Sequence, residues 1–395
     1  MSASTARVPL HIGLYLAALQ FFFALGWIVY VVYLPQLAQQ AGLDRRFVPW
    51  LLLADQLVFI VTDLAVGLAS DRAARVLGRI GRWVVAASLV SALAFAALPW
   101  VAPQGSPLLF AAVTLLWVVT TSALRAPPLT LLGRYVARPQ QPAMVALSMA
   151  GLGVANALAP YVGLQLKSIS PWWPFVLSAT ALALLALGMV AAERSLAGQA
   201  PAAAPGTATA AAPARGEVGF FLAACVAGAL AFQWHQSVSS APLLLRHATP
   251  EQLPALMPVF WVGFNLCLLP ASLMCKRLGA ASVMAMGAEL AMLAVAGAAL
   301  APGLPLLVAA QLAAGAGWAL LLCAAFSGAL ALGHTGREGL MNGSLQATLA
   351  AAALARIAIV TTTAPAPAQA VDMAWWPAAG FLVCAGLLVR NALRR

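Results

Sequence analysis

Four ionisable side chains lie in stretches of the sequence that are otherwise apolar. Asp55 and Asp63 share one stretch, Arg125 lies in a second and Arg356 in a third. Because a charged side chain at the centre of a membrane costs about 3 kcal/mol or more, such residues usually face a protein interior or a water-filled path. Four of them in one chain predict that the protein moves something polar.

Arg125 and Asp63 form the first candidate pair. At ~1.5 Å per residue along a helix, both lie at a similar depth in their stretches, so we expect an ion pair between them. Protonation of Asp63 would release Arg125 to bind a substrate, which would couple proton movement to solute movement. The alternative is a static ion pair that fixes two helices together. Asp55 is eight residues from Asp63 and turned from it by about 80°, so it can face a different partner.

The elements that must position these residues are membrane-spanning helices. Hydrophobic residues make up 63% of the 395 residues and charged residues 8%, against roughly 25% charged in soluble domains. Apolar runs of about 20 residues recur twelve times, and each is long enough to cross a hydrocarbon core of ~30 Å. The fourth run covers 107–132 and the seventh covers 218–241. We therefore predict an all-α integral membrane protein with twelve transmembrane helices. The first run is too long for a cleaved signal peptide.

The net charge of +11 predicts how the chain is oriented. If the N-terminus is cytoplasmic, fifteen of the 21 Lys and Arg residues fall on the inner side, as the positive-inside rule requires. This predicts a multi-pass protein of a bacterial-type inner or plasma membrane, with both termini in the cytoplasm. The basic side chains would then contact anionic lipids, and no nucleic-acid partner is expected. The five cysteines all lie in predicted helices and are interpreted as packing residues, so no metal site is expected.

Residues 195–216 interrupt the apolar pattern with an Ala- and Pro-rich segment that has almost no large apolar side chain. Such a segment cannot bury a core, so we expect a flexible cytoplasmic linker. It divides the chain into an N-terminal half, 1–194, and a C-terminal half, 217–395, each with six predicted helices. Two halves of six helices joined in this way are typical of transporters built from repeats.

The loop after the second predicted helix carries a motif. Gly67, Asp71 and Arg72 fall in the order G-x-x-x-D-R, and Gly78-Arg79 follows. Gly67 permits close helix approach, and Asp71 can cap the end of a helix from the other half. The alternative is an ordinary charged cytoplasmic loop.

This motif, with the two halves, resembles the signature of the major facilitator superfamily. The resemblance implies that Asp71 meets the start of helix 11, near 340–345, and that this contact closes an inner gate. The longer form of the loop, with Ala74 where the common signature has glycine, resembles the sucrose:proton and glycoside–cation symporter branch. Arg125 falls where that branch carries an arginine on helix 4. The second half shows no motif of that branch.

The same resemblance places helices 1, 4, 7 and 10 around a central cavity. The polar and aromatic residues on these helices that we expect to line it are Gln20, Trp27, Tyr30, Thr121, Gln233, Trp234, His235, Gln236, Gln311 and Trp318. Amides between aromatic rings suit a hydroxylated or zwitterionic solute. The alternative for each of these residues is that it packs or hydrogen-bonds between helices and does not line a cavity. The resemblance also makes helices 2 and 11 neighbours, so that an Asp55–Arg356 salt bridge would close an outer gate while the inside is open.

We therefore predict a secondary active transporter that moves a small polar solute by alternating access, coupled to protons as a symporter. The alternatives are a proton-driven exporter of an amphipathic compound and a transporter-like receptor without flux. An enzyme using His235 with Asp63 or Asp55 is disfavoured, because no nucleophile–base pair or metal-ligand set is local in the sequence. No cofactor is expected, and the superfamily resemblance implies a monomer.

Overall fold

The computed structural model describes residues 10–77, 80–199, 215–333, 336–363 and 366–393. All regular secondary structure in these residues is helical, and twelve spans are long and apolar enough to cross a membrane, as predicted. The spans of the first half consist of α1 (Leu10–Gln40), α2 (Val48–Leu77), α3 (Gly81–Val101), α4 (Pro107–Thr121) with α5 (Pro127–Tyr135), α6 (Gln141–Leu166) and α7 (Trp172–Gln199).

The second half repeats this pattern of six spans. They consist of α8 (Arg215–Trp234) with α9 (Ser240–Leu245), α10 (Leu253–Leu256) with α11 (Pro258–Leu278), α12 (Ala280–Ala299), α13 (Leu304–Gly333), α14 (Glu338–Thr363), and α15 (Pro367–Asp372) with α16 (Trp376–Leu393). Most of the predicted linker lies outside the described residues, so the limits of the two halves and the linker stay predictions.

The fourth and seventh spans are broken, whereas the sequence predicted continuous helices. In the fourth, a 3₁₀ turn (η3, Ser122–Leu124) separates α4 from α5, because Pro127 and Pro128 lack the N–H groups that would continue the α-helical ladder. In the seventh, a π-helical segment (η5, His235–Ser239) joins α8 to α9. Breaks of both kinds free backbone groups, and π segments occur frequently at functional sites.

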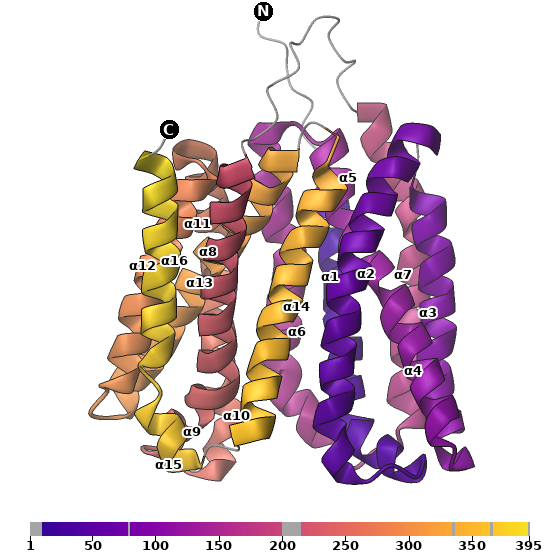
Figure 1. The fold of residues 1–395 in the computed structure, drawn as a ribbon, viewed down its shortest axis with the longest axis horizontal. Helices are drawn as coiled ribbons and strands as arrows, with labels where there is room; N and C mark the ends of the chain where they lie inside the picture. Colours follow the sequence, from indigo (N-terminus) through magenta and orange to yellow (C-terminus); the bar gives the residue numbers. More distant parts are fainter. Residues whose placement is uncertain (1–9, 78–79, 200–214, 334–335, 364–365, 394–395) are drawn as a thin grey trace, which may run out of the picture.

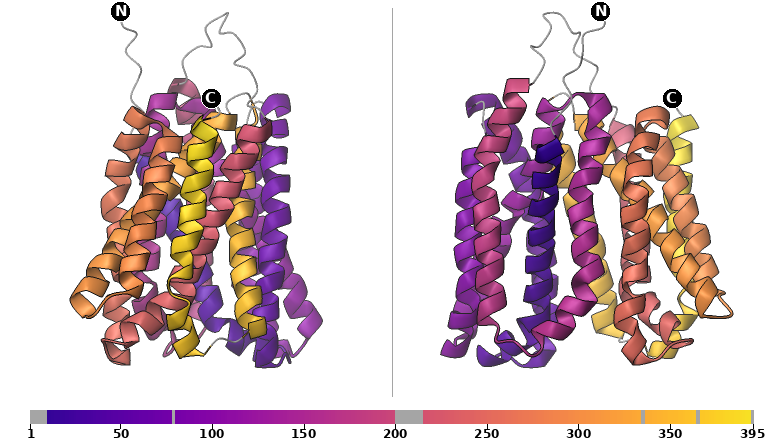
Figure 2. Two further views of the ribbon diagram at one scale, coloured as in Figure 1. Left: turned by 60° about the vertical axis from the view of Figure 1, so that its left-hand side comes forward. Right: turned by 180° about the vertical axis from the view of Figure 1, so that it is seen from behind.

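The spans run side by side and form one bundle (Figures 1 and 2). α1 begins and α16 ends at the same end of the bundle, which we name the terminal end (Figure 1). The two halves meet where α2 packs against α14 and where α6 packs against α11. Large apolar side chains are exposed on the outside, among them Leu93, Leu108 and Leu300, as expected of a surface that faces lipid.

Candidate functional site

An ion pair lies beside the break in the fourth span. Asp63 of α2 is fully buried, and its Oδ2 lies 3.3 Å from Nη2 of Arg125, which lies between α4 and α5. The predicted pair is therefore formed. Neither oxygen of Asp63 has a hydrogen-bond partner of good geometry among the described residues, so the attraction to Arg125 is mainly electrostatic. A buried carboxylate held in this way depends on one cation for its charge balance.

Arg125 also contacts the second half of the chain. Its Nη2 donates to Oε1 of Gln346 on α14 at 3.4 Å, and Nε2 of Gln346 donates to the backbone oxygen of Arg125 at 3.4 Å. The guanidinium lies over the ring of Phe59, 4.3 Å from its centroid. One charged side chain thus touches α2 of its own half and α14 of the other half.

A second amide of α14 binds the same break. Nδ2 of Asn342, a fully buried residue, donates to the backbone oxygen of Ala126 at 2.7 Å. Ala126 is the residue directly before the Pro127–Pro128 pair that ends the ladder. The break in the fourth span therefore leaves backbone carbonyl groups that face the second half, and two side-chain amides of α14 donate hydrogen bonds to them. Sequence reasoning missed Asn342 and Gln346, although the paired prolines were a signal that carbonyl groups nearby would need partners.

The predicted motif joins α2 to the start of α14. Oδ1 of Asp71 accepts from the backbone N–H of Gly339 at 2.7 Å, and Oδ2 accepts from that of Leu340 at 2.8 Å. A methyl group on Gly67 would overlap the carbonyl oxygen of Gly339, so only glycine permits this approach. The contact lies at the terminal end and agrees with the expected partner near 340–345. Arg72 is exposed, while Gly78 and Arg79 lie outside the described residues.

The predicted pair of Asp55 with Arg356 is not formed in this structure. Oδ2 of Asp55 instead accepts a hydrogen bond from the hydroxyl of Tyr30 on α1, at 2.8 Å. The side-chain hydrogen bonds between α14 and the first half involve its first three turns, up to Gln346. Arg356 lies ten residues further along, or ~15 Å, where no such contact is made among the described residues.

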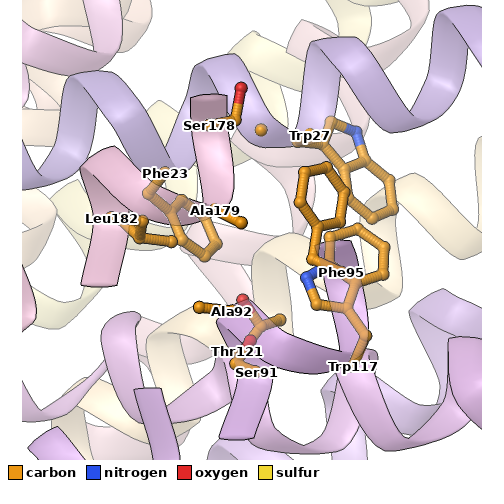
Figure 3. A pocket seen from close by; sticks show the side chains of 11 residues that line it. Phe23, Trp27, Ser91, Ala92, Phe95, Trp117, Thr121, Ser178, Ala179 and Leu182 are labelled. Atoms are coloured by element: carbon orange, nitrogen blue, oxygen red, sulfur yellow. The ribbon is translucent and has the colours of Figure 1, made fainter. Parts of the chain in front are cut away.

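Trp27 and Thr121 line a small cavity inside the first half, with Ser91, Phe95 and Trp117 on other walls (Figure 3). The space open to the centre of a water-sized sphere is ≈ 20 Å³, which is enough for about one water molecule. The hydroxyl of Ser91 is buried without a partner among the described residues. This cavity therefore fits a structural water better than a transported solute.

The polar cluster predicted on the seventh span forms a buried network. Nε2 of His235 lies 3.0 Å from Oε1 of Gln311 on α13, whose Nε2 donates to Oγ of Ser240 at 3.3 Å. That hydroxyl donates in turn to the backbone oxygen of His235, at 2.9 Å. Gln233 and Gln236 are half-buried, and Gln20 of α1 is buried. Within the described residues, no three His, Cys, Asp or Glu side chains gather as a metal site would require.

Two tryptophans expected at the cavity are packed against other rings. Trp318 stacks on Phe232 with ring centroids 4.2 Å apart, and Trp234 stacks on Trp376 at 5.7 Å. Both are nearly fully buried. The alternative interpretation, helix packing, describes these two residues in this structure.

A further buried carboxylate was not anticipated. Glu193 near the end of α7 accepts from the backbone N–H groups of Ile80 and Gly81, at 2.9 Å and 2.8 Å. It caps α3 within the first half, as Asp71 caps α14 across the halves. In the sequence it resembles an ordinary charge at the end of an apolar run.

Comparison with known proteins agrees with this architecture. The sequence profile of the Major Facilitator Superfamily matches residues 16–358. No curated protein sequence gives a significant match. Among solved structures, the chain is similar to a bacterial homologue of the iron transporter ferroportin in an outward-facing state, with TM-score 0.74 and 13% identity over 97% of this chain and 99% of that chain.

Two other solved structures are similar to nearly the same extent. One is the E. coli fucose:proton symporter FucP, with TM-score 0.66 and 15% identity over 97% of this chain and 98% of that chain. The other is the human organic anion transporter MFSD10, with TM-score 0.67 and 14% identity over 97% and 100% of the two chains. At these identities the likeness concerns the fold.

Proposed function

Because the chain belongs to the Major Facilitator Superfamily, and is thus a multi-pass membrane transporter by family, we propose that it moves a small polar solute by proton-coupled symport. The observation that carries this proposal is the buried Asp63–Arg125 pair. It lies where the two halves meet, because Arg125 also contacts Gln346 of α14. A change in the charge of Asp63 would therefore act on the contact between the halves.

The proposed coupling follows from the charge balance of the pair. While Asp63 is ionised, it neutralises Arg125 in a setting where few other groups compete. When Asp63 takes up a proton, it no longer holds the guanidinium electrostatically. Arg125 can then bind hydrogen-bond acceptors of an incoming solute, and loss of the proton on the other side returns Arg125 to Asp63. Solute and proton would then cross in the same direction.

We further propose that the terminal end of the bundle is cytoplasmic, in agreement with the distribution of basic residues. The contacts of Asp71 with Gly339 and Leu340 would then hold the inner side shut. This arrangement would accept solute from outside. Rocking of the halves would break these contacts and bring Asp55 and Arg356 together, which would close the outer side.

The test is the internal pH of proteoliposomes that contain the purified full chain. A panel of sugars, amino acids, peptides and organic acids is added outside, and a pH-sensitive dye inside reports proton movement. We expect one solute class to acidify the lumen, and we expect Asp63→Asn and Arg125→Ala to abolish the signal. Asp44→Asn is the matched control, because Asp44 is an exposed loop carboxylate that pairs with its neighbour Arg46.

The direction of the signal separates the alternatives. Acidification on solute entry supports symport, whereas alkalinisation of the lumen as solute enters would indicate exchange of solute for protons. Solute flux without any pH change, or a pH signal that survives Asp63→Asn, would contradict the proposed coupling.

A further inference from the structure

Arg356 is a charged residue without a counter-charge in the described part of the chain. A guanidinium cannot lose its proton in a protein, so it must be neutralised or solvated. Asp63 pairs with Arg125 and Asp44 pairs with Arg46, so neither carboxylate neutralises Arg356. The expected partner of Arg356, Asp55, accepts a hydrogen bond from Tyr30 instead. Arg356 thus has a free positive charge deep within a membrane span.

The position of Arg356 leaves its charged end accessible. The residue is half-buried, and Nε is the only one of its side-chain nitrogens that is fully enclosed without a partner. The two terminal nitrogens of the fork are therefore not fully enclosed. A guanidinium whose terminal nitrogens are not enclosed and have no partner among the described residues can bind an acidic group.

The seventh span, which packs beside α14, carries polar groups that lack partners among the described residues. Val360, one turn beyond Arg356 on α14, packs against a cluster formed by Trp234, Val238 and Ala370. In this part of the seventh span, four buried polar atoms have no hydrogen-bond partner among the described residues: Nε1 of Trp234, Nδ1 of His235, Oε1 of Gln236 and Oγ of Ser239. Because buried polar atoms without partners are rare and π segments occur frequently at functional sites, this part of the seventh span is a candidate for contact with a ligand.

Arg356 and the amides of the seventh span lie at the same depth along their helices. α8 and α14 pack against each other, and both begin at the terminal end (Figure 1). Arg356 lies 18 residues after Glu338, where α14 begins, and Gln233 lies 18 residues after Arg215, where α8 begins. At ~1.5 Å per residue, both lie about 27 Å from the terminal end. The guanidinium and the amides of the seventh span are therefore at one level.

We propose that Arg356 binds the carboxylate of a small organic anion, and that the transported solute belongs to this class. The planar fork of arginine matches the two oxygens of a carboxylate, and the resulting bonds are charge-assisted. Half-buried amides of the seventh span would bind the rest of the solute at this level, before it moves on to Arg125. This inference rests on the proposed transport function and deepens it. When the outer side closes, Asp55 would replace the solute carboxylate at Arg356 and so promote release of the solute inward.

The test compares carboxylates with their neutral amides on the purified full chain in detergent. The probes are lactate and lactamide, succinate and succinamide, and benzoate and benzamide, with inorganic phosphate as a further anion. Binding is measured by the thermal unfolding midpoint over a range of ligand concentrations. We expect at least one carboxylate to bind and its amide to bind at least about tenfold more weakly.

Variants then assign the effect to Arg356. Arg356→Gln should abolish carboxylate binding, Arg356→Lys should retain part of it, and Arg246→Gln, at an exposed arginine, should leave it unchanged. In the double variant Asp55→Arg with Arg356→Asp, the two residues can still form an ion pair at the outer gate. This variant should nevertheless fail to bind the anion, because position 356 no longer carries a positive charge. Retention of the unliganded unfolding midpoint in each variant shows that it is folded, and Arg356→Lys keeps the test decisive if Arg356→Gln does not fold.

Three results would overturn the anion site. They are the absence of binding by every carboxylate, equal binding of an amide, and carboxylate binding that survives Arg356→Gln. Binding of phosphate alone would also overturn the assignment to carboxylates. The failure of this site is distinguishable from failure of the transport function. Flux of a neutral solute that persists in Arg356→Gln keeps the function and removes the site, whereas Arg356-dependent binding without flux keeps the site and removes the function.

Discussion

Replacement of Asp71 by alanine should open the terminal end of the bundle. Both oxygens of the Asp71 carboxylate accept backbone N–H groups of α14, at 2.7 Å and 2.8 Å. These groups belong to Gly339 and Leu340, in the first turn of α14, where the helix dipole favours a negative charge. Because the acceptor comes from the first half and the donors from the second, the variant weakens the contact between the halves and should spare the fold of each half.

The size of the effect follows from the two bonds. A hydrogen bond to a charged group contributes about 1.5 kcal/mol or more after exchange with water, so two contribute about 3 kcal/mol. In the open state, water would solvate the same N–H groups, so the loss falls almost entirely on the closed state. About 3 kcal/mol corresponds to roughly a 150-fold rise in the equilibrium constant for opening.

The assay is the distance between spin labels on the two halves. Exposed Arg138 and Arg277 are suitable sites, because their neighbours Pro139 and Lys276 line one groove between the halves in this structure. The native cysteines are replaced by alanine first. We expect a short distance to dominate in the parent protein and a longer distance to gain population in Asp71→Ala, with Asp44→Ala as the unaffected control. An unchanged distance distribution in Asp71→Ala would refute the reasoning.

Two further predictions concern other buried polar contacts. Gln346 could transmit the charge state of Asp63 to the contact between Asp71 and the start of α14. Asp63→Asn should then shift the distances between the same spin labels, and adding Gln346→Ala should remove most of that shift. Ser344→Ala, a control on the same helix, should leave the shift unchanged. Additive shifts would show that Gln346 has only a structural role. Glu193→Ala removes two charge-assisted bonds that cap α3 and should destabilise the first half by about 3 kcal/mol. A thermal unfolding midpoint within error of the parent would contradict this.

The heights of charged groups along the helices were predictable from the sequence. A constant rise per residue fixes depth, so Asp63 and Arg125 could be paired from their positions in two apolar runs. The approach of Gly67 and Asp71 to the start of α14 was expected only from the resemblance to the major facilitator superfamily. The residue types showed that a close approach and a cap were possible, but they did not identify the partner helix.

Rotation about the helix axes and helix breaks were not predictable in the same way. Depth and the neighbouring helices implied by the family resemblance suggested Arg356 for Asp55, but Tyr30 of α1 faces that carboxylate instead. Average hydropathy treated 107–132 as one helix, although Pro127 and Pro128 break it and create the carbonyl groups that Asn342 and Gln346 bind. Such partners come from opposite halves, and only the packed structure brings them together.

The central claim is that Asp63 couples the proton to the solute. The most direct measurement uses the solute that evokes a pH change, in proteoliposomes with the parent protein or Asp63→Asn. Exchange of labelled for unlabelled solute at equal concentrations is compared with uphill uptake driven by an imposed proton gradient. The account predicts that Asp63→Asn retains exchange and loses uphill uptake. Uphill uptake equal to that of the parent protein would show that the proton moves without Asp63.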